Sequence, residues 1–470
     1  MRKTKIICTI GPASENKETL IAMCKAGMNV ARLNFSHGTY PEQQSKIDLI
    51  KQVRQELGLP IAIMLDTKGP EYRIRTFESG RITLNEGDDF IFTTDEVEGD
   101  QHRVSVNYKH LTENLKPGDR ILVNNGLVVF EVTGIRGSDV QTRVIVGGEL
   151  SNRKSMSFPN KVMSGPYLSE QDKQDLLFGI QNEVDFVAAS FVSTKDDMEE
   201  LKAFLAANGG GNIDLIAKIE NRAGVDNIES ICEVADGVMI ARGDLGVEIP
   251  FVEVPAIQKR LTSTCRMLGK RVITATEMLE SMIHNPRPTR AEISDVANAV
   301  YDGNSAVMLS GESAAGKYPV EAVKTMADIC QFTEQHTSYN KRFYKADFHI
   351  RNTLDAVSHA VCAMAIDVEA KGIVVCSVSG TTARMVSRFR CPVDIIGMTT
   401  DERIYRRLAL SWGVTPVLSE EFNSQDVMFF YAMASAKKAL HLQKGDRVVL
   451  TGGPINGKTG NTNTIKVETV

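Results

Sequence analysis

The sequence predicts an α/β protein: a (β/α)₈ TIM barrel with an inserted all-β lid domain and a C-terminal α/β domain. Three observations predict this arrangement. Eight short apolar or β-branched runs alternate with stretches of helical period, which indicates parallel strands joined by right-handed crossovers. The alternation stops once, after the third run, where only strand and turn signals follow. A second, shorter alternating region occupies the C-terminal part of the chain.

The eight predicted barrel strands share this apolar composition. They are Lys5–Thr9, Asn29–Leu33, Ile61–Asp66, Asp185–Ser190, Ile213–Ile219, Gly237–Ala241, Arg271–Ala275 and Ser305–Leu309. Amphipathic stretches between them, such as Glu18–Ala26 and Val254–Leu268, are expected to be helices. Eight strand–helix units suit a closed barrel, and such barrels carry their active sites at the C-terminal ends of the strands.

The inserted segment, Tyr72–Pro159, contains short alternating runs separated by turn signals such as Asn125-Gly126. It follows the third strand and is therefore placed to cover the barrel mouth as a lid. A polar, aromatic stretch, Gln335–Arg351, is the expected linker to the C-terminal domain. We divide the chain into two barrel parts, an insertion and a C-terminal effector domain; the ranges are 1–69, 70–165, 166–340 and 341–470.

Composition excludes several classes of protein. With 42% hydrophobic and 24% charged residues the chain is neither disordered nor fibrous. The net charge of −5, with no block of positive charge, argues against a nucleic-acid or membrane-surface partner. No apolar run approaches the roughly 20 residues of a membrane span, and the N-terminus leaves no room for a signal peptide. The eight cysteines form no C-x-x-C pair, which favours buried reduced thiols in a cytoplasmic protein.

Polar side chains follow six of the eight predicted strands. They are Arg32, Asn34, Ser36 and His37 after the second strand; Asp66, Thr67 and Lys68 after the third; Lys218, Glu220 and Asn221 after the fifth; Arg242 and Asp244 after the sixth; Thr276 and Glu277 after the seventh; and Ser310 and Glu312 after the eighth. Helix capping explains single cases, such as Thr289 with Glu292, but not six strand ends at one mouth. These side chains therefore predict one active site.

The residue types indicate the chemistry. Glu220 and Asp244 offer hard oxygen ligands on neighbouring strands, which suits Mg²⁺ or Mn²⁺. Lys218 points to the same side as Glu220, two residues on, and can stabilise developing phosphoryl or enolate charge. Arg32 and Arg73 can bind anionic oxygens. Since no paired histidine or nucleophile accompanies this set, metal-assisted phosphoryl or enolate chemistry is favoured over acyl transfer.

Two backbone segments are suited to anions. Gly243, in the run Arg-Gly-Asp-Leu-Gly, opens a helix or turn whose amides can hold a carboxylate or phosphate. In the C-terminal domain a strand ending at Cys376 leads into a helix through hydroxyl and glycine residues, which can form a phosphate cradle or an ordinary helix cap. The candidate phosphate ligands there are Ser377, Ser379, Gly380, Thr381 and Thr382.

At these residues the chain closely resembles the pyruvate kinases, along essentially its whole length. The matching runs, highly specific in this order and spacing, are Thr9–Pro12, Asn29–Gly38, Leu65–Glu71, Lys218–Asn221, Ala241–Gly246, Asn285–Glu292 and Leu309–Glu312. The resemblance implies transfer of the phosphoryl group of phosphoenolpyruvate to ADP, giving ATP and pyruvate in the last step of glycolysis. It also implies a homotetramer and a sugar-phosphate effector bound near the loop 457–464.

The resemblance implies a role for each matching residue. Glu220 and Asp244 bind the divalent metal, Lys218 stabilises the phosphoryl group, Thr276 lies against the substrate and Ser310 helps relay the proton that ketonises the enolate. Arg32 and Arg73 face phosphates, Gly243 and His37 join the substrate and nucleotide contacts, and Asn34, Ser36, Asp66 and Thr67 hold K⁺. Glu71 occupies the position that separates potassium-dependent members from those with a lysine, so we expect potassium dependence.

Several positions depart from the family pattern. The pairs Ser193-Thr194, Ser164-Gly165 and Asn124-Asn125 replace Arg-Lys, Asp-Leu and Asp-Asp, and Glu277 replaces Gln. Lys195 is the candidate substitute for the missing base. Two rival interpretations remain open: a barrel lyase acting on a phosphoenolpyruvate or pyruvate enolate without a nucleotide, and a degenerate paralogue that acts as a metabolite sensor.

Overall fold

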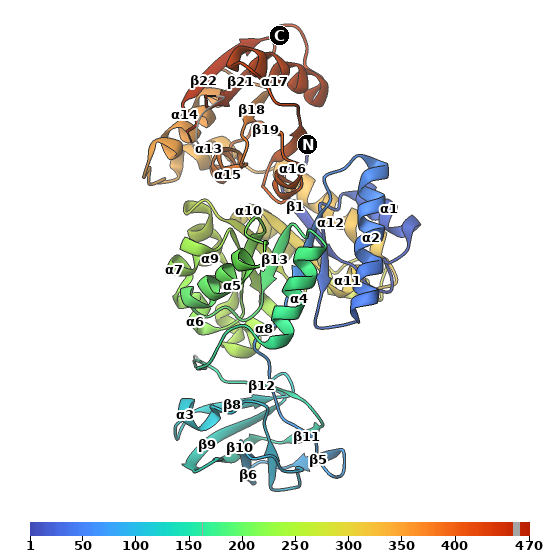
Figure 1. The fold of residues 1–470 in the computed structure, drawn as a ribbon, viewed down its shortest axis with the longest axis vertical. Coiled ribbons are helices and arrows are strands. Elements are labelled where there is room, and N and C mark those ends of the chain that lie inside the picture. Colours follow the sequence, from blue (N-terminus) through green and yellow to red (C-terminus); the bar gives the residue numbers. More distant parts are fainter. Residues whose placement is uncertain (162, 455–460) are drawn as a thin grey trace.

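The computed structural model describes residues 1–161, 163–454 and 461–470. Three parts are stacked along the long axis of the molecule, with the barrel in the middle, the inserted sheet domain at one end and the C-terminal domain at the other (Figure 1). This order places the insertion and the C-terminal domain at opposite ends of the barrel.

The barrel is closed and all its strands are parallel, as predicted. Its strands are β1 (Lys5–Thr9), β2 (Val30–Asn34), β3 (Ala62–Asp66), β13 (Phe186–Ala189), β14 (Asp214–Ile219), β15 (Gly237–Ala241), β16 (Arg271–Ala275) and β17 (Ala306–Leu309). Side chains such as Ile7, Met64, Phe186 and Ile273 fill its interior, together with Leu410 of the C-terminal domain. The barrel is therefore a packed core whose base is plugged by another domain.

Helices surround the barrel and several begin at the caps that the sequence indicates. They are α1 (Lys17–Ala26), α2 (Tyr40–Leu57), α4 (Glu170–Gln181), α5 (Lys195–Ala207), α6 (Arg222–Asp226), α7 (Ile228–Val234), α8 (Arg242–Glu248), α9 (Val254–Met267), α10 (Arg290–Asp302), α11 (Gly311–Ala314) and α12 (Pro319–Gln335). Thr289 and Glu292 form the predicted capping box of α10. No helix in the described part of the chain is long and apolar enough to cross a membrane.

The insertion is an antiparallel-rich sheet domain around an aromatic core. A seven-stranded sheet has the order β4-β12-β8-β9-β10-β6-β7, and β11 pairs with β5. The bounds are β4 (Tyr72–Arg73), β5 (Arg81–Leu84), β6 (Asp89–Thr93), β7 (Arg103–Ser105), β8 (Arg120–Val123), β9 (Val128–Arg136), β10 (Asp139–Val146), β11 (Gly148–Ser151) and β12 (Ser155–Ser157), with a short helix α3 (Leu111–Asn114). Phe90, Phe92 and Phe130 pack against one another in its core.

The C-terminal domain is a five-stranded sheet with helices on both faces. Its order is β20-β19-β18-β21-β22, and only β22 is antiparallel. The bounds are β18 (Gly372–Cys376), β19 (Asp394–Thr399), β20 (Val414–Leu418), β21 (Arg447–Gly452), β22 (Thr464–Thr469), α14 (Thr353–Asp367), α15 (Thr381–Arg388), α16 (Glu402–Leu408) and α17 (Gln425–Leu440). The sequence patterns did not predict β20 and β22. Pro416 interrupts the strand signal of β20, which is an edge strand and tolerates proline there.

The segment expected as a linker is ordered rather than a free connection. It contains helix α13 (Tyr339–Lys345), whose Phe343 is buried and stacks on His359. The aromatic residues of this segment are used for packing and not for an exposed linker. Their burial stabilises the short helix α13 against the C-terminal domain.

Buried ion pairs join the C-terminal domain to the base of the barrel. Arg406 Nε lies 2.7 Å from Asp185 Oδ1, and Arg407 Nη1 lies 2.5 Å from Asp214 Oδ1. Arg271 of β16 also binds Asp214, at 2.7 Å. These aspartates stand at the N-terminal ends of barrel strands, so the opposite, C-terminal ends face the inserted domain.

Candidate active site

Lys218 is the centre of a buried polar cluster at the barrel mouth. Its Nζ donates to Ser190 Oγ at 2.7 Å and to Asp66 Oδ1 at 3.0 Å, and it lies 3.0 Å from Glu220 Oε1. Burial alone would lower the pKa of Lys218, but the carboxylates of Asp66 and Glu220 raise it above its ordinary value. The ammonium is therefore charged at neutral pH and held in place by groups from β3, β13 and β14.

Arg32 shares Asp66 with Lys218. Its Nε donates to Asp66 Oδ2 at 2.6 Å and its Nη1 donates to Thr9 Oγ1 at 2.9 Å. Burial opposes ionisation of Asp66, but the two cations outweigh it and lower the pKa of this carboxyl. The carboxylate thus orients two cations toward the mouth.

Glu220 has one oxygen that no hydrogen bond satisfies. Its Oε2 accepts from Phe191 N at 2.6 Å, whereas Oε1 is buried, has no hydrogen-bond partner and contacts only Lys218. Burial raises the pKa of Glu220 to about 7, and the charge of Asp244 adds to this effect. Such a carboxylate fits a cation, which would restore its charged form.

Asp244, in the first turn of α8, is exposed at the mouth. Among the residues that the structure describes, no group of three or more His, Cys, Asp or Glu side chains could hold a metal. Mg²⁺ commonly takes only one or two carboxylates and completes its shell with water and substrate oxygens, so the residue types of Glu220 and Asp244 are compatible with this ion.

Thr276 stands in a strained turn after β16. It has φ +67°, followed by Glu277 at φ +54°, and a β-branched residue rarely adopts this conformation. Gly243 N donates to Thr276 Oγ1 at 2.8 Å, and Arg242 Nη2 donates to Thr276 O at 2.6 Å. The strain is held by these contacts and presents the threonine hydroxyl beside the amide of Gly243.

Ser310, at the end of β17, has a buried Oγ without a hydrogen-bond partner. The neighbouring Glu312 carboxylate is occupied by backbone amides: it accepts from Ser310 N at 2.7 Å and Leu279 N at 3.0 Å. Glu312 thus caps two backbone amides, whereas the Ser310 hydroxyl is left without a partner among the described residues.

The four residues expected to hold K⁺ lie along the adjacent ends of β2 and β3, where Asn34 is in register with Asp66. Asn34 Oδ1 accepts from Ser36 N at 3.0 Å, and Thr67 Oγ1 accepts from Ser190 N at 3.2 Å. His37 is exposed, further along the same loop. Asp66 connects this group to the Lys218 cluster, since Lys218 Nζ donates to Asp66 Oδ1 at 3.0 Å.

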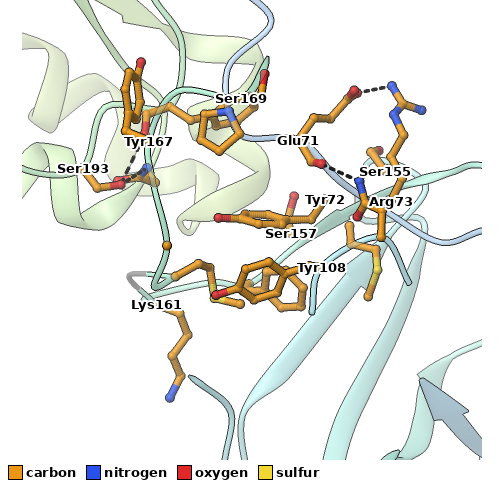
Figure 2. Close-up of a pocket in the computed structure, with 18 of the residues that line it drawn as sticks. Glu71, Tyr72, Arg73, Tyr108, Ser155, Ser157, Lys161, Tyr167, Ser169 and Ser193 are labelled. Carbon is orange, nitrogen blue, oxygen red and sulfur yellow. Dashed lines mark hydrogen bonds and ion pairs between the residues drawn. The ribbon is translucent and has the colours of Figure 1, made fainter. Parts of the chain in front are cut away.

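A cavity of about 620 Å³ lies between the inserted domain and the barrel (Figure 2). Asp244 and Ser193 line it from the barrel, and Glu71, Tyr72 and Arg73 line it from the connecting strand. Arg73 forms an ion pair with Glu71 and donates to Arg153 O at 2.6 Å, so its guanidinium is held by the connecting strand and the inserted domain.

Lys195 is not among the residues that line this cavity. Its Nζ pairs with Glu233 at 2.7 Å and Glu199 at 3.5 Å on the outer surface. The structure therefore gives no support to Lys195 as the substitute for the missing base at Ser193.

Sequence reasoning missed Ser190, Thr9 and the positioning role of Arg242. Ser190 donates to Thr67 O at 2.7 Å as well as accepting from Lys218, so it connects two neighbouring strand ends. The available signal was its position: it is the polar residue that ends the fourth predicted strand.

The candidate effector segment enters α15 through a left-handed glycine. Gly380 has φ +73°, Ser379 Oγ donates to Thr381 Oγ1 at 3.0 Å and Ser377 N donates to Met398 O at 2.9 Å. The Thr382 hydroxyl contacts that of Thr462 at 2.6 Å. Gly380 is the N-cap of α15 and provides no side-chain hydrogen bond to the first turn. Residues 457–460 of the expected neighbouring loop lie outside the described residues.

Comparison with known proteins agrees with this geometry. The family model of the pyruvate kinase barrel domain matches residues 1–323, and that of the pyruvate kinase alpha/beta domain matches residues 355–468. The chain belongs to the pyruvate kinase family. It is therefore a phosphotransferase of the glycolytic type, and the resemblance and fold class predicted from the sequence are confirmed.

Individual pyruvate kinases are similar over the full chain. The pyruvate kinase of Clostridium acetobutylicum is 46% identical over 472 residues, covering all of both chains. That of Geobacillus stearothermophilus is also 46% identical, and this chain covers 80% of it. A crystal structure of a pyruvate kinase from Cryptosporidium parvum has a TM-score of 0.94 at 35% identity, covering 100% of this chain and 96% of the other.

Proposed function

We propose that the barrel mouth transfers the phosphoryl group of phosphoenolpyruvate to ADP, giving ATP and pyruvate. The observation that carries this proposal is the Lys218 ammonium, fixed between Asp66 and Glu220, beside an unsatisfied oxygen of Glu220. A fixed cation next to a carboxylate suited to a metal matches a reaction whose transition state spreads negative charge over phosphoryl oxygens.

Each residue has one task in this mechanism. Glu220 and Asp244 would hold Mg²⁺, which when bound neutralises charge on phosphate and enolate oxygens. Lys218 stabilises the phosphoryl group as it leaves, and Arg32 binds a phosphate oxygen while remaining anchored on Asp66. Thr276 positions the substrate beside the Gly243 amide.

The enolate that remains must gain a proton at carbon. The unpartnered hydroxyl of Ser310, at the neighbouring strand end, supports a role in relaying this proton from solvent. No other assignment made above uses this hydroxyl.

The finer assignments rest on family likeness. They are K⁺ bound by Asn34, Ser36, Asp66 and Thr67, and the nucleotide near His37. The same applies to a homotetramer and to a sugar-phosphate effector at Ser377–Thr382, where an open helix start supports phosphate binding. The four domain ranges remain a proposal that rests on the strand and helix patterns of the sequence.

A coupled assay tests the function directly. Purified protein with phosphoenolpyruvate, ADP, Mg²⁺ and K⁺ is expected to release pyruvate and ATP in equal amounts. Pyruvate formed without ADP would instead identify a lyase or phosphatase. No pyruvate under any effector would identify the sensor.

Glu220→Gln is expected to raise the Mg²⁺ concentration for half-maximal activity by about tenfold or more, since one anionic ligand is worth at least about 1.4 kcal/mol. The amide keeps the shape of the side chain, and far-UV circular dichroism checks that the variant is folded. The measurement is a Mg²⁺ titration at saturating substrate, with Glu233→Gln as a control, because Glu233 is an exposed carboxylate that pairs with Lys195 on the outer surface. An unchanged Mg²⁺ requirement in Glu220→Gln would refute the ligand assignment.

Turnover in buffer free of K⁺ and Na⁺ is expected to fall at least about tenfold. This corresponds to about 1.4 kcal/mol of stabilisation that the monovalent cation no longer provides. In the structure the Glu71 carboxylate is paired with Lys68 and Arg73, which hold its pKa low against partial burial. When Arg73 turns to a phosphate, this carboxylate loses a partner that a monovalent cation can replace. Glu71→Lys is expected to restore activity without K⁺, and full wild-type activity without added cation would contradict the prediction.

A further inference from the structure

Three guanidinium groups from three parts of the chain meet around Gly303, at the end of α10. Arg390, just after α15, donates to Gly303 O from Nε at 3.0 Å and from Nη2 at 2.9 Å. Arg266 Nη1 (α9) and Arg342 Nη1 (α13) lie 3.4 Å and 3.6 Å from the position that a Cβ of Gly303 would occupy. The cluster therefore joins the barrel, the connecting segment and the C-terminal domain, where α10, α13 and α15 approach one another (Figure 1).

No carboxylate balances these charges. Within the described ranges, none of the three arginines forms a salt bridge, and Asp302, the acid next to Gly303, pairs with Lys259 at 2.5 Å. The other partners of Arg390 are neutral: Ser387 O and Ser305 Oγ. Burial, with the charges of Arg266 and Arg342, lowers the pKa of Arg390 to about 9, so the group is still cationic at neutral pH.

Several donors in the cluster are unused. Arg266 Nε and Arg342 Nη1 are buried without a hydrogen-bond partner, as is the hydroxyl of Tyr339, which is 6% exposed. Burying like charges and unsatisfied donors is costly unless something compensates them. A stable fold that retains such a cluster therefore points to a bound anion.

We propose that Arg266, Arg342 and Arg390 bind a small tetrahedral oxyanion of the phosphate class. The planar fork of a guanidinium matches phosphate oxygens. Arg342 Nη2 already donates to Tyr301 O, and the donors that remain for an anion are Arg266 Nε, Arg342 Nη1 and the Tyr339 hydroxyl. The site is distinct from the active site, because Gly303 lies at the N-terminal base of the barrel, just before β17. An anion here ties the C-terminal domain to the barrel.

Inorganic phosphate is the probe, and the measurement is the thermal unfolding midpoint of the full chain in chloride buffer with increasing phosphate. The variants are Arg266→Gln and Arg342→Gln. The matched control is Arg136→Gln, because Arg136 is an exposed arginine of β9 with no salt bridge in the described residues. Phosphate bound at the barrel mouth or at Ser377–Thr382 stabilises all four proteins equally.

In chloride alone, Arg266→Gln is expected to unfold at the wild-type temperature or above it, because the variant removes one of three uncompensated charges. Phosphate is expected to raise the unfolding midpoint of the two cluster variants by less than it raises that of wild type and of Arg136→Gln. The reason is that each cluster variant binds phosphate about 10- to 100-fold more weakly. If Arg266→Gln does not fold, the same comparison is made with Arg342→Gln, because Arg342 lies on a partly exposed helix.

Equal phosphate stabilisation of all four proteins overturns the proposal. So does a phosphate-grown crystal in which a carboxylate of a second copy of the chain occupies the cluster. Tetrahedral density within hydrogen-bond distance of Arg266 and Arg342 supports it.

Discussion

Lys218→Met is expected to lower kcat for phosphoryl transfer by about 10³-fold, the upper range for removing one preorganised electrostatic group. The methionine fills the space of the lysine stem but cannot balance charge on the transferring phosphoryl group. Proton exchange into the methyl group of bound pyruvate is expected to survive in part, since Ser310 and Thr276 remain. The measurements are the coupled assay and deuterium uptake into pyruvate, followed by NMR.

The matched control is Lys195→Met, which removes a lysine that follows the preceding strand, β13, and is paired on the outer surface. It is expected to retain wild-type kcat. Equal loss of phosphoryl transfer and proton exchange in Lys218→Met would count against the role of this lysine, since it would indicate a general collapse of the site. The far-UV circular dichroism of the variant separates this case from unfolding.

Asp214→Asn is expected to destabilise the protein by about 3–5 kcal/mol, because it leaves buried arginine charge without its partner. Asp214 binds Arg271 within the barrel and Arg407 of the C-terminal domain, and Arg271 is only 5% exposed. The fluorescence of Trp412, the single tryptophan, reports the loss during urea unfolding. This residue is 1% exposed at the junction, with Arg390 over its ring.

Asp89→Asn is the matched control for this experiment. The Arg143–Asp89 pair is 3.4 Å apart and both side chains are mostly exposed, so its loss is expected to cost at most about 1 kcal/mol. A urea midpoint that shifts equally in Asp214→Asn and Asp89→Asn would show that the interface pairs contribute no more than surface pairs.

Much of the candidate site could be predicted because the positions that carry it follow a simple rule. Polar residues that end parallel strands meet at one mouth, so Lys218 of β14 and Asp66 of β3 could be placed at the same end of the barrel from spacing alone. The rule says nothing about which polar group contacts which. Ser190, which accepts from Lys218, was therefore missed, and Lys195 was given a position that the fold does not provide.

Local patterns by themselves determined the eight barrel strands, the inserted sheet domain and the place of the active site, because strand and helix periods are properties of neighbouring residues. Only the tertiary structure decided how distant parts meet: Leu410 in the barrel base, α13 folded against the C-terminal domain, Glu71 paired with Arg73, and three arginines around Gly303. These contacts depend on how the folded domains pack against one another. Residues far apart in the chain leave no periodic pattern in the sequence that would reveal such contacts.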